Sequence, residues 1–355
     1  MRVTVLKLGS LFDGIGVFPL AAVHCGMEPV WASEIEARPI SITKRHFPDM
    51  LHLGDITKIS GAEIPPVDVI TFGSPCQDLS QIGTRNGFAG KKSSLFYQAM
   101  RIIEEMRYAT NGRYPAFCIW ENVAGAFSSN DRLDFAAMLS AFTGAEVSVP
   151  PRGWAHAGMV RGGCADTAWR LLDAQYWGEP ALVQRRKRVF VVADFAGQRA
   201  GEVLFKPRTV FPFATGVGPG GLSATQRGGV PAAQTGRQVP IVRPFSLRRM
   251  RTMAQVGDQK GFCASFGRGG EPFPTLLASV TAPFSFWYEG EERDGFLRAL
   301  TPLECERLMG LPENWTKYGC KDEEISDHAR YRALGNSIAL PCAEYVMAGI
   351  AEVMN

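Results

Sequence analysis

The sequence contains no run of roughly 18 consecutive apolar residues, which is the length that a helix needs to cross a membrane. Its hydrophobic content of 46% and charged content of 21% are those of ordinary globular proteins. We therefore expect a globular protein with no membrane partner. At 355 residues, the chain is long enough for one large domain and a smaller one.

Spacings that indicate metal sites or disulfides are also missing. The eight cysteines and five histidines are dispersed, and they form neither a CxxC nor an HxxxH pair. A zinc site or a disulfide framework would need such pairs, so we predict no metal. The chain runs from Met1 straight into an apolar segment without the pattern of a signal peptide. We therefore expect a cytoplasmic protein.

The net charge of +3 is small, but it is unevenly distributed. Nine basic residues and one acidic residue lie between Arg199 and Met253. A local excess of this kind predicts a surface that binds phosphates. A solvated basic face without a partner is the alternative on charge alone.

Short apolar runs alternate with amphipathic stretches over the first two hundred residues. This alternation is typical of βαβ units, so we predict an α/β fold with a doubly wound, mostly parallel sheet. Strands are expected at residues 3–8, 29–32, 51–53, 67–71, 116–120 and 189–193, and helices at 18–25, 39–46, 95–107 and 133–142.

The composition changes after Asp194, where glycine and proline become frequent and long helices become improbable. This change predicts a domain boundary. We expect a catalytic domain at 1–195, a smaller loop-rich, β-containing domain at 196–325, and a C-terminal segment at 326–355 with a helix over 338–353.

A rigid loop with a thiol follows the strand expected at 67–71. The loop reads Phe72-Gly73-Ser74-Pro75-Cys76, and it places Cys76 at the carboxyl end of a sheet strand, where open α/β sheets hold their ligands. Pro75 restricts its own backbone and that of Ser74. Cys76 is thus a candidate nucleophile, and the alternative is a small hydrophobic core residue.

Acidic residues follow three successive strands: Asp13, Glu34 and Asp55. Such residues at the strand ends of a doubly wound sheet often bind the hydroxyls and amines of a nucleoside. The loop before the first helix contains Gly14 and Gly16, which allow a ligand to approach the backbone. The loop is not the dinucleotide fingerprint GxGxxG, and an ordinary glycine turn is the alternative.

Two further groups of polar residues lie near the predicted sheet edge. Glu121 ends the strand expected at 116–120, where it would share an edge with Cys76. A helix cap or an ion-pair partner is the alternative for this carboxylate. The run 184–188 precedes the last strand, and strand alternation places Gln184, Arg186 and Arg188 on one face. A charged edge strand is the alternative for this run.

Taken in order, these motifs resemble the DNA cytosine-5 methyltransferase family, in its single-chain bacterial or phage form. The resemblance runs from residue 8 to about 345 and includes Arg298-Ala299-Leu300-Thr301-Pro302 and Gly335-Asn336-Ser337. It implies the Rossmann-like fold of class I methyltransferases that use S-adenosylmethionine, with a target recognition domain at 196–325. The implied activity is methyl transfer to carbon 5 of cytosine in double-stranded DNA.

The resemblance assigns the catalytic roles to three residues. Cys76 would add to carbon 6 of cytosine as a thiolate, which makes carbon 5 nucleophilic enough to accept a methyl group. Glu121 would bind the Watson–Crick edge of the base and protonate its ring nitrogen 3. Arg186 would orient the base and stabilise the adduct. The base that removes the carbon-5 proton is not identified by the sequence.

The same resemblance implies a binding site for S-adenosylmethionine. Phe12 would face the adenine, Glu34 would bind the ribose hydroxyls, and Asp55 would read the adenine edge. The complete expected set is Phe12, Gly14, Gly16, Glu34, Ile35, Asp55, Ile56, Pro75, Leu95, Asn336 and Ser337. Val17 replaces a glycine that is usual in the family, and we expect it to crowd the methionine end of the cofactor.

The target cytosine is inaccessible inside a duplex, so it would have to be flipped out. The residues expected to contact DNA are Gln77, Ser80, Arg85, Arg188, Arg248, Arg249, Arg251 and Thr275. A monomer is expected. Two settings stay open for its partners: an enzyme that accompanies a separate, unbound restriction endonuclease, and an orphan or phage enzyme.

Two other functions fit the same scaffold. A transfer-RNA cytosine-5 methyltransferase would carry a Cys-Phe-Thr element, which this sequence lacks. A catalytically silent DNA-binding relative would not need Cys76, Glu121 and Arg186, which are all present. The DNA sequence that is recognised is not determined by these motifs.

Overall fold

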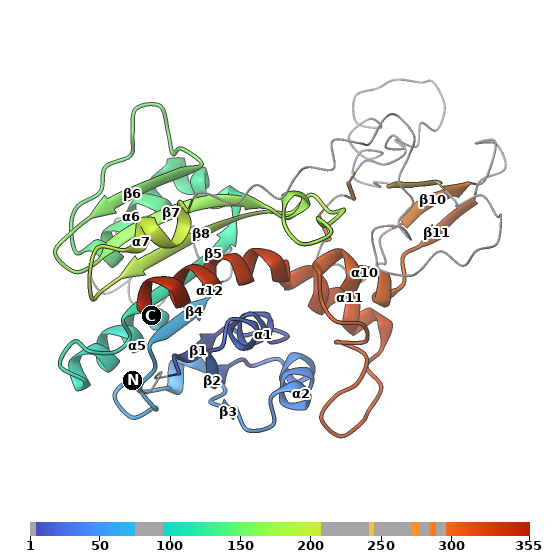
Figure 1. Cartoon of the computed structure of the whole chain (residues 1–355), viewed down its shortest axis with the longest axis horizontal. Helices are drawn as coiled ribbons and strands as arrows, with labels where there is room; N and C mark the ends of the chain where they lie inside the picture. The colour runs from blue at the N-terminus through green and yellow to red at the C-terminus, as the bar shows by residue number, and fades with distance from the viewer. Residues whose placement is uncertain are drawn as a thin grey trace.

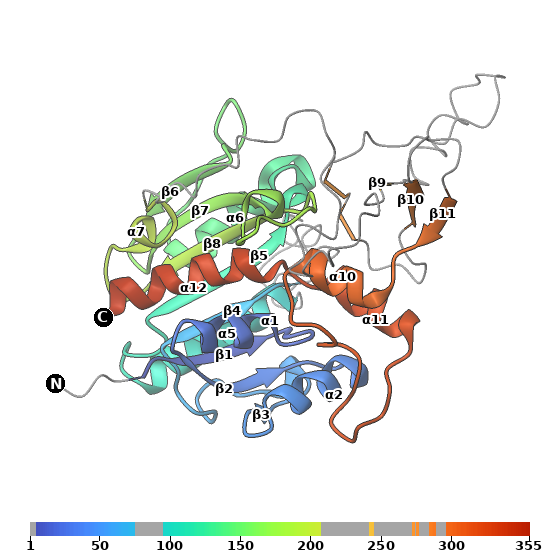
Figure 2. The same cartoon turned by 45° about the vertical axis from the view of Figure 1, so that its right-hand side comes forward.

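The computed structural model describes residues 5–74, 95–206 and 298–355 with their side chains, and four residues of the segment 272–276. For residues 241–244, 284–288, 296 and 297 it describes the backbone alone. Figures 1 and 2 show a large sheet with helices on both faces, and a small sheet set apart from it.

The large sheet has eight strands in the order β3-β2-β1-β4-β5-β8-β7-β6. The five strands from β3 to β5 are parallel, and β8, β7 and β6 continue the sheet in antiparallel pairs. Their bounds are β1 Lys7–Leu11, β2 Glu28–Ser33, β3 Leu51–His52, β4 Val69–Phe72, β5 Phe117–Val123, β6 Ala157–Arg161, β7 Asp166–Asp173 and β8 Lys187–Asp194.

Helices cover both faces of this sheet, and each face has its own hydrophobic core (Figure 1). One core joins α1, α7 and α12 to the sheet, and the other joins α5 and α6. The α-helices are α1 Val17–His24, α2 Ala37–His46, α5 Leu95–Ala109, α6 Leu133–Thr143, α7 Ala200–Leu204, α10 Pro302–Met309, α11 Asp327–Asn336 and α12 Leu340–Met354. Short 3-10 helices lie at η1 Ile56–Lys58, η4 Ala124–Phe127, η5 Ser129–Arg132 and η6 Ala174–Tyr176.

The sequence explains why these elements form. All four residues of β4 are apolar or hydroxylated and fully buried, as expected of a central parallel strand. In α5 the buried residues recur at helical spacing. Helix α10 begins with Pro302 and a capping box, in which Thr301 and Glu304 bind each other's backbone N–H groups.

The predicted α/β fold is confirmed, and every helix expected in the first domain is present within two residues of its expected bounds. The first strand begins later than expected, at Lys7. The prediction missed β6 and β7. Strand β7 contains Asp166, Arg170 and Asp173, and the charge of Arg170 is held by hydrogen bonds to Leu204 and Tyr345, far away in the chain. The helix expected at 338–353 is α12.

The small sheet is antiparallel and has the order β11-β10-β9. Its strands are β9 Ile241–Pro244, β10 Phe284–Tyr288 and β11 Phe296–Ala299. They fall inside the segment expected to form the second domain, whose boundaries stay a prediction.

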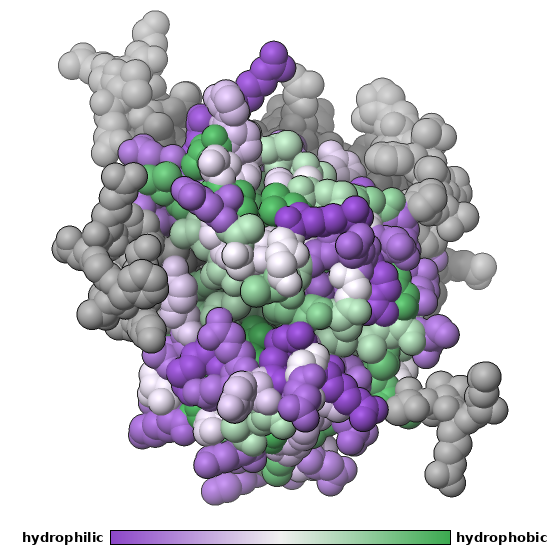
Figure 3. Space-filling model, turned by 90° about the vertical axis from the view of Figure 1, so that its left-hand side faces the viewer, coloured by the Kyte–Doolittle hydropathy of each residue, from purple (hydrophilic) through white to green (hydrophobic). Residues whose placement is uncertain are grey.

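Among the described helices, none by itself has the length and apolar composition of a membrane span, and only α11 with α12, bent by 43°, pass that test together. Figure 3 shows the face at the left of Figure 1, where apolar residues gather centrally between hydrophilic ones.

Candidate active site

The carboxyl ends of β1, β4 and β5 meet at one edge of the sheet. Leu11 pairs with Phe72 of β4, and Phe72 pairs with Trp120 of β5. The chain moves from β1 outward to β2 and β3 and then returns to β4, so β1 and β4 form the switch point at which open α/β sheets bind ligands. The loop that leads to Cys76 therefore starts beside Glu121.

Two hydrogen bonds hold the start of this loop. The indole N–H of Trp120 donates to the hydroxyl of Ser74 over 3.1 Å, and the amide of Asn122 donates to the Ser74 carbonyl over 2.9 Å. Ser74 and Asn122 are both buried. The backbone is thereby fixed two residues before Cys76, which itself lies outside the described residues.

Glu121 is buried at this edge and is 9% exposed. Its carboxylate packs against Gly73, where an added Cβ would lie 3.1 Å from Oε2. Oε1 lies 3.0 Å from Nε of Arg188. Burial raises the pKa of Glu121, while the positive charges of Arg188 and Arg186 oppose the rise. The pKa of this carboxyl therefore lies above that of an exposed carboxyl, which favours proton transfer near neutral pH.

Arg186 has a different environment from Arg188. It is 1% exposed, and its guanidinium donates to the carbonyls of Leu276, Gly335 and Ser337. Burial lowers the pKa of Arg186 to about 9, with Arg188 as a further cause. Arg186 thus ties the start of β8 to the end of α11.

The two arginines were expected to serve different roles, Arg186 at the base and Arg188 at the DNA. Among the described contacts, Arg188 is the one that touches Glu121. Alternation along an extended segment predicted both on one face, but it could not say which would meet the carboxylate. That outcome depends on the register of β8 against β5, in which Arg188 pairs with Val123.

The glycine loop after β1 has the backbone of a ligand cradle. Phe12, Gly14 and Gly16 have positive φ angles of 53°, 60° and 78°. An added Cβ at Gly14 would meet no atom within 4 Å, so the space above it is open. Glu34 accepts hydrogen bonds from the backbone N–H groups of Gly14, Ile35 and Glu36. These bonds fix the carboxylate at the end of β2.

Of the other expected cofactor residues that the structure describes, Ile35 follows β2, and the rest lie at the ends of η1, α5 and α11. Ile35 is 73% exposed, which is unusual for an isoleucine and leaves it free to contact an apolar ligand surface. Asp55 accepts hydrogen bonds from the N–H and the hydroxyl of Thr57, and these bonds lower the pKa of Asp55. Asp55 caps η1, whose first residue is the buried Ile56. Leu95 begins α5, and Asn336 and Ser337 lie at the end of α11.

Val17 was expected to crowd the methionine end of the cofactor. It is the first residue of α1, it is 3% exposed, and it belongs to the core that α1 shares with α12. This side chain therefore contributes to packing, and its effect on cofactor affinity stays a prediction.

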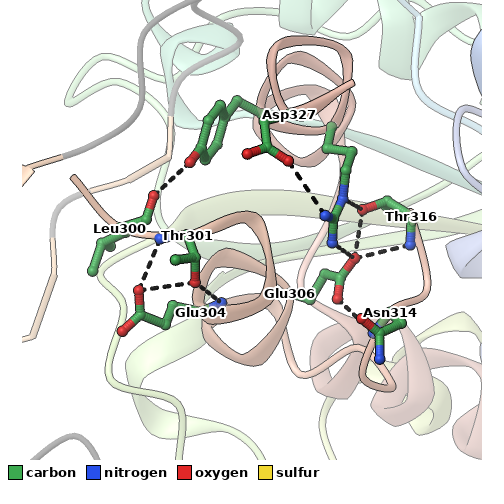
Figure 4. Close-up of polar contacts among 9 residues, drawn as sticks. Leu300, Thr301, Glu304, Glu306, Asn314, Thr316 and Asp327 are labelled. Carbon is green, nitrogen blue, oxygen red and sulfur yellow. Dashed lines mark hydrogen bonds and ion pairs between the residues drawn. The ribbon is translucent and has the colours of Figure 1, made fainter. Parts of the chain in front are cut away.

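Residues after α10 hold the glycine loop from outside, although they lie within the segment expected to form the second domain. The indole N–H of Trp315 donates to the carbonyl of Ile15 over 2.8 Å, and its ring stacks on His46 of α2 at 3.5 Å. Trp315 is positioned by its neighbour Thr316, which binds Glu306 in a buried network with Arg330 (Figure 4). The last fifty residues are thereby part of the site's framework.

Asp13 has an unusual environment in the glycine loop. Both carboxylate oxygens are buried, and neither has a hydrogen-bond partner among the described residues. Burial raises the pKa of Asp13 to about 7, and the charge of Glu34 adds to the rise, whereas Ser10 and Thr43 oppose it. The sequence placed Asp13 at a strand end, but nothing local indicated that its carboxyl would be buried.

Asp13 should give the stability of the protein a measurable pH dependence. A folded-state pKa above the ordinary value of 3.8 contributes stability at low pH that is lost as the pH rises through about 7. Between pH 5.5 and 8.5 we expect the free energy of unfolding to fall by about 2 kcal/mol more in wild type than in Asp13→Asn. Urea unfolding at both pH values measures this difference. The control is Asp49→Asn at an exposed position; parallel changes in wild type and Asp13→Asn would contradict the prediction.

Comparison with known families agrees with this geometry. The model of the C-5 cytosine-specific DNA methylase family matches residues 6–207 and 248–352. The chain belongs to this family. The resemblance expected from the motifs is thus confirmed, and the family and fold imply S-adenosylmethionine as the methyl donor.

Several characterised proteins are similar to this methylase over nearly its whole length. The type II methyltransferase M1.ScrFI of Lactococcus lactis subsp. cremoris is 26% identical, with 98% of this chain and 78% of the relative covered. M.HhaI of Haemophilus parahaemolyticus is 23% identical, with 100% and 97% covered. The DNA N-6-adenine-methyltransferase of Escherichia phage P1 is 24% identical, with 96% of this chain and 60% of that relative covered.

Solved structures support the fold. The Entamoeba histolytica methyltransferase EhMeth has a TM-score of 0.61 at 12% identity, with 99% of both chains covered. The Dnmt2 methyltransferase of S. pombe has a TM-score of 0.59 at 16% identity, with 99% of this methylase and 100% of Dnmt2 covered. At these identities the likeness is one of fold.

The described contacts bring together part of the expected site. Glu121, Arg188 and the start of the Cys76 loop share one edge, and Thr275 donates to the carbonyl of Arg185 over 2.7 Å. The expected residues that lie outside the described part of the methylase are Pro75, Cys76, Gln77, Ser80, Arg85, Arg248, Arg249 and Arg251. The described residues include no cluster of metal-ligating side chains.

Proposed function

We propose that this methylase transfers a methyl group from S-adenosylmethionine to carbon 5 of a cytosine that is flipped out of a specific double-stranded DNA sequence. The observation that carries the proposal is the buried Glu121, paired with Arg188 at the edge where the loop to Cys76 begins. The family is named for methylation of carbon 5 of cytosine in DNA, which indicates the methyl acceptor. Glu121, held by Arg188, is the proton donor that this reaction would use.

The residues at the edge fit S-adenosylmethionine. The fit rests on the open space above Gly14, the exposed Ile35, and the carboxylate of Glu34, which backbone N–H groups hold in place. Glu34 would accept hydrogen bonds from the ribose hydroxyls, and Ile35 with Phe12 would contact the adenine. When bound, the cofactor supplies an electrophilic methyl group on a sulfonium.

The protein groups prepare the acceptor. The thiolate of Cys76 adds to carbon 6 of cytosine, and the electron pair of the ring double bond becomes available at carbon 5. Glu121 gives a proton to ring nitrogen 3 as the addition proceeds, which its burial-raised pKa favours. Arg188 holds the Glu121 carboxyl in position. Once carbon 5 carries the methyl group, a base takes the carbon-5 proton. The electron pair left behind re-forms the double bond and expels Cys76 as a thiolate, and ring nitrogen 3 returns its proton to Glu121.

Other acceptors are tested by the same experiment. The phage P1 relative is named for transfer to the N-6 position of adenine, so adenine in DNA is one of them. Methylation of an exocyclic amine needs no covalent adduct, and it would leave Cys76 without a catalytic role. Transfer RNA is another acceptor, and a silent DNA-binding protein would transfer to none.

The experiment is incubation with tritiated S-adenosylmethionine and unmethylated genomic DNA, in parallel with transfer RNA, followed by nucleoside analysis. We expect label in DNA as 5-methylcytosine and at least 100-fold less in RNA. Bisulfite sequencing of the product then gives the recognition sequence. Label in N-6-methyladenine or in RNA would replace the proposed acceptor. Cofactor binding without any transfer would indicate the silent protein.

The setting of the enzyme follows from the proposed function. Relatives of the methylase include enzymes named as type II methyltransferases, a class that serves restriction–modification. We propose that it acts as a monomer on DNA in the cytoplasm. A restriction endonuclease of the same specificity would be a separate protein that it does not bind.

A further inference from the structure

A basic cavity lies at the same end of the sheet as Glu121, outside the site described above. Its volume is about 360 Å³. It is lined by side chains from η4, η5, the segment before β6, and the start of β8. The ones that matter here are Phe127, Arg132, Arg152, Trp154, His156 and Lys187.

The lining has an unbalanced charge. Arg132, Arg152 and Lys187 bring three positive charges, and the lining includes no acidic side chain. Within the described part of the chain, none of the three forms an ion pair, whereas Arg101, Arg161, Arg188 and Arg199 each do. A concave site with unpaired cations attracts an anion. Guanidinium groups in particular suit the oxygens of a phosphate.

The local backbone is held in an unfavourable conformation that presents Arg132. Asn130, Asp131 and Arg132 have successive φ angles of 47°, 52° and 74°, although none of them is glycine. Residues other than glycine adopt this region rarely, and strained backbone of this kind tends to occur at functional sites.

Specific contacts maintain the strain. Asn130 donates to the buried carboxylate of Asp134, and the indole N–H of Trp154 donates to the Arg132 carbonyl over 3.0 Å. The Arg132 guanidinium lies against Gly153, where an added Cβ would be 3.1 Å from its central carbon. The arginine is thereby preorganised at the cavity wall. An arginine that is ordered in advance loses less freedom when it binds.

The cavity adjoins the active-site edge along the chain. Ala124 in its wall directly follows β5, the strand of Glu121, and Lys187 directly precedes Arg188. Because side chains alternate along a strand, Lys187 and Arg188 point to opposite faces of β8. A DNA strand that crosses this edge of the sheet would therefore reach both the Glu121 site and the cavity.

We propose that this cavity binds the sugar–phosphate backbone of the substrate DNA next to the flipped-out cytosine. Arg132, Arg152 and Lys187 contact phosphate oxygens, and Trp154 and Phe127 form the apolar wall against the sugar. The proposal rests on the proposed function, since it takes DNA as the substrate. It adds an anchor in the catalytic domain to the DNA contacts expected from the basic segment after Arg199.

The test measures binding of a fluorescein-labelled, random-sequence duplex by anisotropy, with S-adenosylhomocysteine present, over a series of salt concentrations. The double variant Arg132→Ala/Arg152→Ala should bind at least 10-fold more weakly at low salt. Because each lost phosphate contact removes about 0.9 from the slope of log K against log salt, the slope should fall by about 2. Lys187→Ala should lower it by about 1.

The matched control is Arg113→Ala, an exposed arginine before the amino end of β5, at the opposite edge of the sheet. It should bind as wild type does. Arg152→Glu, which leaves the strained turn unchanged, should weaken binding more than Arg152→Ala, and it decides the matter if the double variant does not fold. Each variant is compared with wild type in thermal unfolding and in binding of S-adenosylhomocysteine.

The outcomes separate this proposal from the proposed function. If wild type and Arg113→Ala bind the duplex, and the cavity variants bind equally well with the same slope, the cavity does not contact DNA. If wild type does not bind the duplex at all, the proposed function fails, and this site fails with it.

Discussion

Replacement of Cys76 by alanine is expected to lower methyl transfer to DNA by at least about 10⁴-fold, which corresponds to about 5.5 kcal/mol of transition-state free energy. Carbon 5 of cytosine becomes nucleophilic only when a nucleophile adds at carbon 6. The loss should therefore appear in kcat, while binding of S-adenosylhomocysteine and of duplex DNA stays within about twofold of wild type. Single-turnover transfer of tritiated methyl groups measures the rate.

A matched control and a trapping experiment sharpen this prediction. Cys164 is exposed and free, and Cys164→Ala should transfer at the wild-type rate. DNA that contains 5-fluorocytosine should form an adduct with wild type that survives denaturation, because fluorine cannot leave carbon 5 as a proton does. Cys76→Ala should form none. A Cys76→Ala variant that still methylates DNA would exclude the covalent mechanism and would favour transfer to an amine.

Replacement of Glu121 by glutamine is expected to lower kcat by about 10²- to 10⁴-fold, the usual contribution of a general acid. The amide keeps the size of the side chain and its packing against Gly73, but it cannot give a proton to ring nitrogen 3. Cofactor binding should not change, since the described contacts of Glu121 are with Gly73 and Arg188 and not with the glycine loop. Glu104→Gln, at an exposed position of α5, is the control and should behave as wild type.

Arg188 offers a test of whether Glu121 acts within a pair. Their side chains are 3.0 Å apart, so the double variant Glu121→Gln/Arg188→Ala should lose much less than the product of the two single losses. Because the positive charge of Arg188 lowers the pKa of Glu121, Arg188→Ala should also shift the pH–rate profile upward. Multiplicative losses, with an unshifted profile, would show that the two residues act independently.

The segment 302–355 links these chemical groups to the rest of the fold. Through Trp315 it contacts the glycine loop, and through Gly335 and Ser337 it accepts hydrogen bonds from Arg186, two residues from Arg188. The segment thus touches the expected cofactor cradle and the start of β8 at once. This arrangement explains why the family model continues to residue 352 after its interruption.

The sequence by itself determined the class of the fold and the order of the motifs. Apolar runs of strand length alternate with amphipathic segments, and such periodicity is a local property. For the same reason the loop from Phe72 to Cys76, the glycine loop and Glu34 could be placed at strand ends without a structure. In the structure, Glu34 hydrogen-bonds to the glycine loop and Asp55 caps η1.

Only the tertiary structure decided how distant residues meet. Strand β7 contains the charged Arg170, whose partners Leu204 and Tyr345 lie far away in the chain. Arg188 rather than Arg186 meets Glu121 because the β5–β8 register sets which side chain reaches the carboxylate. The burial of Asp13 and the cationic lining around Arg132 likewise depend on packing between segments, which no local pattern encodes.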